Sequence, residues 1–224
     1  MGTYCNNQGS GAAERTMVIR PHDLIEISDL SLLKWNEEND WAGPSLERTP
    51  FVVVRRAERP NGDYIPVGIR GYNRNQREAV FLHQNGIKNI LSPYWLKEQK
   101  MWKRLNCERK QMPVIAVMDL VMEIMSDWRW GPTGSAGFEM ATGYTALKVT
   151  SDLDLVIDAP QEFDFNKAKI LLQTLDTLSI QIDIQVETGN GAFLLREFIE
   201  QRTKTVVLRT KSGPKLVRNP WDFT

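Results

Sequence analysis

Hydrophobic positions in the second half of the chain follow two different periods, which predict strands and helices in alternation. Apolar side chains cluster over 147–157 and alternate with polar ones over 180–187, patterns typical of a buried strand and a half-buried strand. Between them, residues 165–178 carry leucines and an alanine at helical spacing and predict an amphipathic helix. This strand–helix–strand order indicates a small mixed sheet with helices packed on it.

Other elements of this half follow from turn residues and from the same periods. Pro113 begins a predicted helix, because proline is favoured in the first helical turn, and apolar residues then recur at helical spacing to residue 126. The remaining expected elements are a loop over 128–137, a short helix over 138–142, a turn over 189–191, a helix over 193–202 and a strand over 205–210.

The first half of the chain is richer in strand patterns. Strands are expected over 51–56 and 65–70, and the turn residues over 60–63 indicate that the two strands form a hairpin. Apolar and aromatic residues between 95 and 105 lie on one helical stripe within a charged stretch, which predicts a helix there.

Length and pattern together predict an α+β protein of three segments. A chain of 224 residues accommodates one large domain or two small ones. Residues 1–16 are polar and glycine-containing, so we expect them to be disordered. We expect a smaller strand-rich α+β domain over 17–111 and a second domain over 112–224.

Composition excludes several classes of protein. The formal net charge is zero, so no overall field attracts nucleic acid or a membrane surface. Cys5 and Cys107 are the only cysteines, and with His22 and His83 as the only histidines they favour neither a disulfide scaffold nor a structural zinc site. The chain contains no apolar run long enough for a membrane span and no signal-peptide pattern near residue 1. We therefore expect a cytoplasmic enzyme with no membrane or nucleic-acid partner.

Two aspartates within the apolar strand pattern are the first candidates for chemistry. Asp152 and Asp154 are two residues apart, so on a strand they point to the same face, roughly 6.5–7 Å from one another. Their repulsion costs about 2 kcal/mol at an effective dielectric constant of about 20. Mg²⁺ removes such a cost and prefers carboxylates together with substrate phosphates. The pair therefore indicates a metal and phosphate site.

A small-residue turn precedes this strand. Gly134 lets backbone N–H groups approach a phosphate closely, and Ser135 adds a hydroxyl at a possible helix start, where the helix dipole favours anions. An ordinary Gly-Ser turn is the alternative. The absence of a Gly-rich dinucleotide fingerprint and of a Walker motif argues against hydride transfer and P-loop hydrolysis.

The site needs a third carboxylate to complete the metal ligands and to accept a proton from a hydroxyl group. Asp183 lies between two isoleucines on the next predicted strand, and we favour it for this role. Glu187 remains the competitor, because it shares the face of Asp183 about 13 Å further along the strand.

Basic residues that could hold the phosphates occur in two groups. Arg70, Arg74 and Arg77 follow the end of a glycine-containing strand, and arginine makes bidentate contacts with phosphate. A second group near the end of the chain consists of Lys204, Arg209 and Lys211. Each of these is otherwise explained as a solvated surface charge.

The spacing of these motifs resembles a known superfamily. Gly134-Ser135 followed by Asp152-Leu153-Asp154 and Asp183 is similar to the nucleotidyltransferases that include DNA polymerase beta, except that the gap between Ser135 and Asp152 is longer than usual there. This resemblance implies a polymerase-beta-like core over 112–224, in which Asp152, Asp154 and Asp183 are metal ligands and catalytic residues.

A closer resemblance covers nearly all of the chain after residue 16. The family is malonate decarboxylase holo-[acyl carrier protein] synthase, also called phosphoribosyl-dephospho-CoA transferase. The motifs that carry it are Arg20-Pro21-His22-Asp23-Leu24, Val53-Val54-Arg55-Arg56, Val67-Gly68-Ile69-Arg70-Gly71, Trp130-Gly131-Pro132-Thr133-Gly134-Ser135-Ala136-Gly137-Phe138-Glu139, Ala141-Thr142-Gly143, Ser151-Asp152-Leu153-Asp154-Leu155, Val186-Glu187-Thr188, Gly191-Ala192-Phe193 and Asn219-Pro220-Trp221.

This resemblance implies a substrate, a cofactor and a partner. The donor would be 2′-(5″-triphosphoribosyl)-3′-dephospho-CoA, the acceptor a serine of the acyl carrier subunit of malonate decarboxylase, and the leaving group pyrophosphate, with Mg²⁺ at the aspartates. The substrate-binding residues would be Gly134, Ser135, Arg70, Arg74 and Arg77. From the two strands, the charged helix and the basic cluster of the N-terminal part, we also expect that part to contact the carrier protein or the CoA end of the donor. A different nucleotidyltransferase, such as one that modifies citrate lyase or adenylylates a protein or small molecule, and a non-enzymatic assembly factor are the alternatives.

Overall fold

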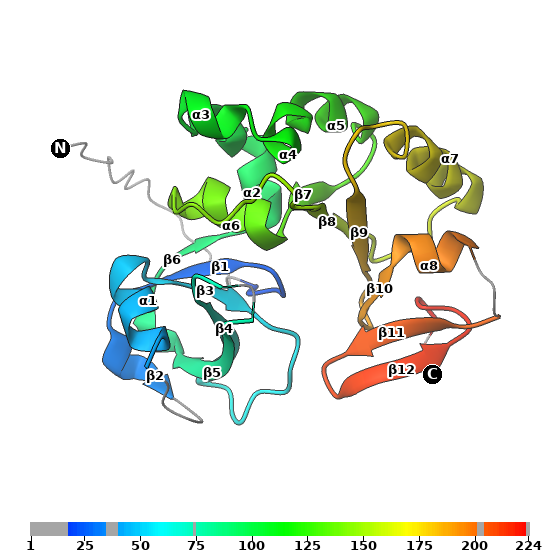
Figure 1. Ribbon diagram of the computed structural model, residues 1–224. Coiled ribbons are helices and arrows are strands. Elements are labelled where there is room, and N and C mark those ends of the chain that lie inside the picture. Colours follow the sequence, from blue (N-terminus) through cyan, green and yellow to red (C-terminus); the bar gives the residue numbers. More distant parts are fainter. Residues whose placement is uncertain (1–17, 35–39, 74, 201–203, 223–224) are drawn as a thin grey trace, which may run out of the picture.

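The computed structural model describes residues 18–34, 40–73, 75–200 and 204–222, and within them the chain forms two six-stranded sheets with helices (Figure 1). The expectation of a mixed α+β protein is confirmed. The segment 1–16, expected to be disordered, lies outside the described residues.

The first sheet is antiparallel and has the strand order β2-β5-β4-β3-β1-β6. Its strands are β1 (Leu24–Ile27), β2 (Leu33–Lys34), β3 (Phe51–Val54), β4 (Tyr64–Arg70), β5 (Arg77–His83) and β6 (Ile87–Leu91). The predicted hairpin is confirmed, because β3 and β4 pair antiparallel with Val53 opposite Gly68. Helix α1 (Ala42–Arg48) contributes Ala42 and Leu46 to the core of this sheet.

The second sheet is mixed, with the strand order β12-β11-β10-β9-β8-β7. Its strands are β7 (Trp130–Pro132), β8 (Leu153–Asp158), β9 (Ile182–Glu187), β10 (Ala192–Leu194), β11 (Val206–Thr210) and β12 (Gly213–Val217). Strands β8 and β9 run parallel and are connected through helix α7 (Phe165–Leu175), as the strand–helix–strand pattern predicted. The other neighbours in this sheet pair antiparallel.

The remaining helices pack mostly on the second sheet. They are α2 (Pro93–Glu98), α3 (Cys107–Lys110), α4 (Pro113–Ala116), α5 (Met118–Ile124), α6 (Gly134–Thr142) and α8 (Leu195–Glu200). Figure 1 shows α2 and α6 beside β7, α8 beside β9 and β10, and α7 next to α8. Trp102, Met118 and Phe193 are buried in the one large core of this sheet. A domain boundary at residue 112 stays a prediction.

Two helix predictions differ from the structure in their extent. The single helix expected over 113–126 is wrong, because α4 and α5 are separated at Val117, whose N–H donates to the carbonyl of Ile115 only two residues back. The apolar stripe is nevertheless buried as expected, with Val114 and Val121 fully inside. The stretch between 95 and 105 forms two short helical segments, α2 and a 3-10 turn at Met101–Arg104, because the left-handed Lys100 separates them. Leu105 is extended and follows the 3-10 turn.

The loop expected over 128–137 is also wrong. Residues 130–132 form β7, because they pair antiparallel with β8, and α6 already begins at Gly134. The helix expected over 193–202 is preceded by strand β10, which pairs with both β9 and β11. In both segments, pairing with strands distant in the sequence makes the residues a strand. Every helix among the described residues is too short or too polar to span a lipid bilayer.

Candidate functional site

A cavity of about 680 Å³ lies between the two sheets. Both sheets supply charged side chains to its wall. From the first sheet and the segments next to it come His22, Arg55, Arg70, Arg77 and Glu78, and from the second sheet come Asp154, Asp183, Gln185 and Arg209. Gly134 and Phe138 of α6 complete the wall between them. The cavity therefore combines three carboxylates with several arginines, a composition suited to a phosphorylated ligand and a cation.

Asp154 and Asp183 form the acidic centre of the cavity. They are register partners in the parallel pair β8–β9, so their side chains are neighbours on the same face of the sheet. Burial raises the pKa of Asp154, and the charges of Asp183 and Asp152 raise it further, although Arg77 and Arg70 act in the opposite direction. The negative charge of this pair is thus only partly balanced by the protein, which suits a divalent cation.

Asp152 lies directly before strand β8, which begins at Leu153, whose N–H donates to the carbonyl of Gln181. The charge of Asp152 is among those that raise the pKa of Asp154. Asp152 is not among the residues of the cavity wall. Within the part of the chain that the structure describes, no three histidine, cysteine, aspartate or glutamate side chains are grouped as metal ligands. Two of the three predicted acids, Asp154 and Asp183, line the cavity, and the roles of all three stay predictions.

Gly134 places the start of α6 directly against Asp154. Its φ is +59°, and a Cβ built there would lie 1.9 Å from Oδ2 of Asp154. The N–H of Thr133 donates to the backbone carbonyl of Asp154 at 2.9 Å, which ties the turn to β8. Only glycine accommodates both the left-handed backbone and this close approach. The predicted phosphate turn and the predicted aspartate are therefore adjacent.

Arg70 connects the first sheet to the same turn. Its Nη2 donates to Oγ of Ser135 at 2.6 Å, and its guanidinium lies 5.5 Å from the centre of the Phe138 ring. Burial lowers the pKa of Arg70, and the neighbouring charge of Arg77 lowers it further. Arg77 is the register partner of Arg70 on β5, is exposed and lines the cavity. Arg74 lies outside the described residues.

Glu187 lies away from the acidic centre, opposite Asp158 in the β8–β9 register. Its carboxylate accepts hydrogen bonds from Arg56 and from Nε2 of Gln185, the latter at 2.9 Å, and its Oε1 is 3.3 Å from Nε2 of His22. Burial raises the pKa of Glu187, but the hydrogen bond to His22 and the charge of Arg56 hold it below its usual range. Glu187 is therefore paired with basic groups in segments next to the first sheet, whereas Asp183 lies beside Asp154.

The segments that form both sheets match known protein families. The profile described as "Phosphoribosyl-dephospho-CoA transferase MdcG N-terminal domain" matches residues 20–93, and the one described as "Phosphoribosyl-dephospho-CoA transferase MdcG C-terminal domain" matches residues 101–220. The chain belongs to the phosphoribosyl-dephospho-CoA transferase family. The resemblance expected from its motifs is confirmed, as is the expectation of a transferase.

Individual members of the phosphoribosyl-dephospho-CoA transferase family align with almost the whole chain. The protein of that name from Pseudomonas putida (strain GB-1) is 37% identical over 204 residues, which cover 90% of this chain and 95% of the relative. The one from Klebsiella pneumoniae (strain 342) is 37% identical over 203 residues, covering 90% and 96%. The one from Pseudomonas syringae pv. tomato is 34% identical over 213 residues, covering 93% and 96%. No solved structure matches the chain significantly.

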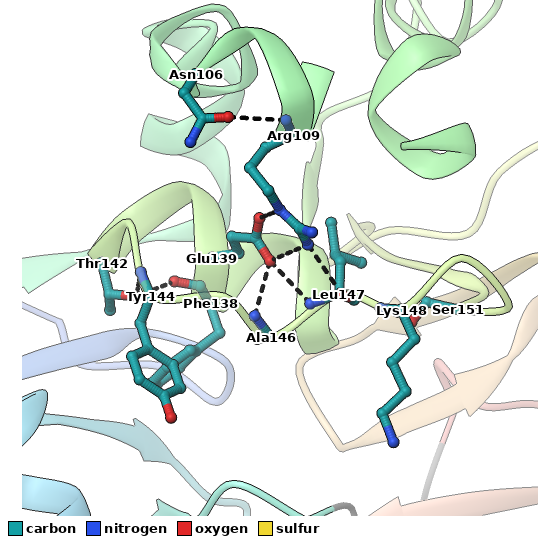
Figure 2. Close-up of polar contacts among 10 residues, drawn as sticks. All are labelled: Asn106, Arg109, Phe138, Glu139, Thr142, Tyr144, Ala146, Leu147, Lys148 and Ser151. Carbon is teal, nitrogen blue, oxygen red and sulfur yellow. Dashed lines mark hydrogen bonds and ion pairs between the residues drawn. The ribbon is translucent and has the colours of Figure 1, made fainter. Parts of the chain in front are cut away.

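This transferase-family chain contains a buried ion pair behind the site that sequence reasoning missed. Arg109 reaches from α3 to Glu139 on α6, with Nε 2.5 Å from Oε1 and Nη2 3.0 Å from Oε2 (Figure 2). The N–H groups of Ala146 and Leu147 each donate to Oε2 of Glu139 at 2.8 Å, and Nη2 of Arg109 donates to the carbonyl of Leu147 at 2.9 Å. Glu139 thus ties α6, which begins at Gly134, to the segment that leads into β8.

We expect replacement of Glu139 by glutamine to lower the free energy of unfolding by about 2 kcal/mol at neutral pH, because an amide at this buried position leaves the partly buried Arg109 without its counter-ion. Burial raises the pKa of Glu139, but Arg109 and the two backbone N–H groups lower it by more, so its folded pKa is below the usual value. The stability that Glu139 contributes is therefore complete above about pH 4.3, the ordinary glutamate pKa, and is lost as the pH falls through the lower folded pKa.

Urea unfolding of the wild type and Glu139→Gln at neutral and acidic pH measures this difference. Glu123→Gln is the matched control, because Glu123 is an exposed glutamate on α5, and we expect it to change stability by less than about 0.5 kcal/mol. Equal stabilities of the two variants at neutral pH would contradict the assignment.

Other residues of the wall carried weaker signals in the sequence. Arg209 belonged to the second basic group, and Arg55 belonged to a family motif but to no predicted site. The alternation of side-chain directions along a strand could have identified Gln185, because Gln185 is on the same face of its strand as Asp183. Nothing local to residues 109 or 139 predicts their contact, because the two lie on different helices.

Proposed function

We propose that the chain transfers the 2′-(5″-phosphoribosyl)-3′-dephospho-CoA group from 2′-(5″-triphosphoribosyl)-3′-dephospho-CoA to a serine of the apo acyl carrier subunit of malonate decarboxylase. Pyrophosphate is the leaving group. Membership of the phosphoribosyl-dephospho-CoA transferase family supports the donor, and the name of the aligned relatives supports the chemistry. The observation that carries the proposal is the adjacency of Asp154, Asp183 and Gly134 in a cavity that also contains arginines.

The reaction is an in-line displacement at the α-phosphorus of the donor. The oxygen of the acceptor serine forms a bond to this phosphorus while the bond to the pyrophosphate oxygen breaks, and Asp183 accepts the proton of the hydroxyl group. Such transfers depend mainly on positioning and on neutralisation of charge. Arg70 and Arg77 neutralise the phosphate oxygens, and the start of α6 at Gly134-Ser135 provides backbone N–H groups for the same purpose.

A divalent cation fits the acidic centre. Asp154 and Asp183 would hold it, with Asp152 next to them, because their mutual repulsion is only partly offset by Arg70 and Arg77. When bound, Mg²⁺ would balance the charge of the carboxylates and of the substrate phosphates.

The fold of the second sheet supports the finer assignment of a polymerase-beta-like nucleotidyltransferase core. In this assignment β8 and β9 carry the acids and α6 carries the Gly-Ser turn. The first sheet then belongs to a smaller N-terminal domain, and the enzyme acts in the cytoplasm on a carrier-protein partner.

Mass spectrometry of the apo carrier protein tests the function directly. After incubation with the chain, the donor and Mg²⁺, we expect the carrier mass to increase by one phosphoribosyl-dephospho-CoA group, with release of pyrophosphate. ATP in place of the donor separates this reaction from adenylylation. An unmodified carrier with the full set of reactants would refute the proposal.

Substitutions of Asp183 and Glu187 are expected to have different effects, because only Asp183 is proposed as the third acid of the site. We expect Asp183→Asn to lower the rate of carrier modification about 100-fold, because Asp183 lies beside Asp154 and lines the cavity. Glu187→Gln should lower the unfolding free energy instead, since it deprives Arg56 and His22 of their carboxylate partner. Rates measured at equal concentrations of folded enzyme distinguish the two. A larger loss of rate with Glu187→Gln would reverse the assignment.

A further inference from the structure

A chain of hydrogen bonds fixes one arginine of the cavity in place. Arg209 on β11 donates from Nη1 to Oε1 of Gln185 on β9 at 3.3 Å. The amide Nε2 of the same glutamine donates to Glu187 at 2.9 Å and lies 2.7 Å from Nε2 of His22. Glu187 is in turn held by Arg56 of the first sheet. The orientation of the Gln185 amide is thereby set, with its oxygen toward Arg209.

The strands between Arg209 and Gln185 leave space for the contact between their side chains. Arg209 pairs with Ala192 on β10, and Ala192 pairs with Glu187 on β9, so the three residues form one cross-strand row on the same face. Ala192, in the middle of this row, has only a methyl group as its side chain. The Arg209 side chain can therefore cross β10 to reach Gln185, and both side chains line the cavity.

The fixed guanidinium lies beyond the acidic centre. Gln185 is two residues after Asp183 on β9, so the two side chains share a face and are roughly 7 Å apart. Arg70 and Arg77 are closer to the other side of the centre, where their charges act on Asp154. Arg55 also lines the wall, and its Cδ lies 3.3 Å from the position of a Cβ built at Gly68, two residues before Arg70 on β4. Arg70 and Arg209 thus lie in two separate regions of one cavity, with Asp154 and Asp183 between them.

From this arrangement we propose that Arg209, held by Gln185, forms a second anion subsite that binds the diphosphate of the dephospho-CoA moiety. The assignment rests on the proposed function, because that donor carries two polyphosphate groups. Its triphosphate contains the reacting phosphorus, whereas its CoA diphosphate is separated from that phosphorus by two ribose rings. A donor of this shape needs cations on both sides of the reaction centre, and a guanidinium already oriented for a bidentate contact loses little entropy on binding.

Calorimetric titration of the full chain with two probes tests the subsite. Dephospho-CoA contains the diphosphate without the triphosphate, and inorganic tripolyphosphate represents the other group. We expect Arg209→Gln to weaken dephospho-CoA binding about tenfold and tripolyphosphate binding less than about twofold. Arg77→Gln should show the reverse pattern. The control is Arg218→Gln, because Arg218 is exposed and outside the cavity wall, and it should leave both affinities unchanged.

Gln185 is a positioning residue in this proposal, and a double-mutant cycle tests that role. We expect Gln185→Leu to raise the donor KM with little change in kcat, and to add nothing to the effect of Arg209→Gln when the two are combined. Additive effects would show that Gln185 does not act through Arg209.

Two results would overturn the subsite: unchanged dephospho-CoA binding in Arg209→Gln, or equal weakening of both probes. Neither depends on group transfer. If the wild type binds dephospho-CoA in an Arg209-dependent way but fails to modify the carrier protein, the proposed function fails and the subsite stands.

Discussion

Replacement of Gly134 by alanine is expected to lower kcat/KM for carrier modification about 100-fold. The added Cβ would lie 1.9 Å from Oδ2 of Asp154, so the carboxylate or the start of α6 must move by more than 1 Å. A displacement of that size between reacting groups costs about two orders of magnitude in rate. The left-handed φ of +59° adds about 1–2 kcal/mol of backbone strain for any residue with a Cβ. Steady-state kinetics and thermal unfolding measure the two effects separately.

Gly143 offers a control at the other end of the same helix. It has a φ of +71°, but a Cβ there meets nothing within 4 Å. Gly143→Ala should therefore show a similar loss of stability through strain and retain most of the activity. Comparable kinetic losses in both variants would mean that strain in α6, and not the collision with Asp154, limits the rate.

Elements with a strong local pattern could be predicted from the sequence. The helix expected over 165–178 is present as α7, and its predicted stripe is buried at Ala168, Leu171, Leu172 and Leu175. The strand expected over 180–187 is present as β9 with alternating burial. In both, one face must be buried, so the side-chain period itself carries the information.

Elements defined by distant partners could not be predicted in the same way. Strand β1 is four residues long and exists because it pairs with β3 on one side and β6 on the other. Strand β7 contains a glycine and a proline, which favour a loop locally, yet pairing with β8 makes it an edge strand. In both strands, hydrogen bonds to strands distant in the sequence override the local secondary-structure propensity.

The candidate site shows the same division. Proximity of Asp154 and Asp183 followed from the strand–helix–strand pattern, because a parallel crossover places successive strands side by side. The contact between Arg70 and Ser135 joins residues 65 positions apart, one on β4 and the other on α6, and no period in the sequence encodes it. The acidic centre was therefore partly predictable, whereas the cations that face it became specific only in the folded chain.

Asp158 provides the matched control for the acid at the centre of the site. It lies on the same strand and face as Asp154, four residues further on, and forms ion pairs with Arg20 at 3.0 Å and Arg129 at 2.9 Å. Asp158→Asn removes the same charge from β8 without touching the cavity wall. We expect it to cost about 1 kcal/mol of stability and to leave the rate within about threefold of wild type.

Asp154→Asn should have the opposite signature, with a loss of about 1000-fold in kcat and no loss of stability. The carboxylate is half-buried beside Asp183, and its charge is unfavourable in the free protein because burial and the neighbouring aspartates raise its pKa. A neutral amide of the same shape removes that repulsion, so the unfolding free energy should stay the same or rise. The amide cannot replace the carboxylate toward a cation or a charged transition state, which requires about 4 kcal/mol of stabilisation for this rate. Carrier labelling and urea unfolding of both variants test this prediction. If Asp154 has only a structural role, Asp154→Asn will lose stability and activity together. If Asp154→Asn retains more than a tenth of the wild-type rate, Asp154 takes no part in the reaction.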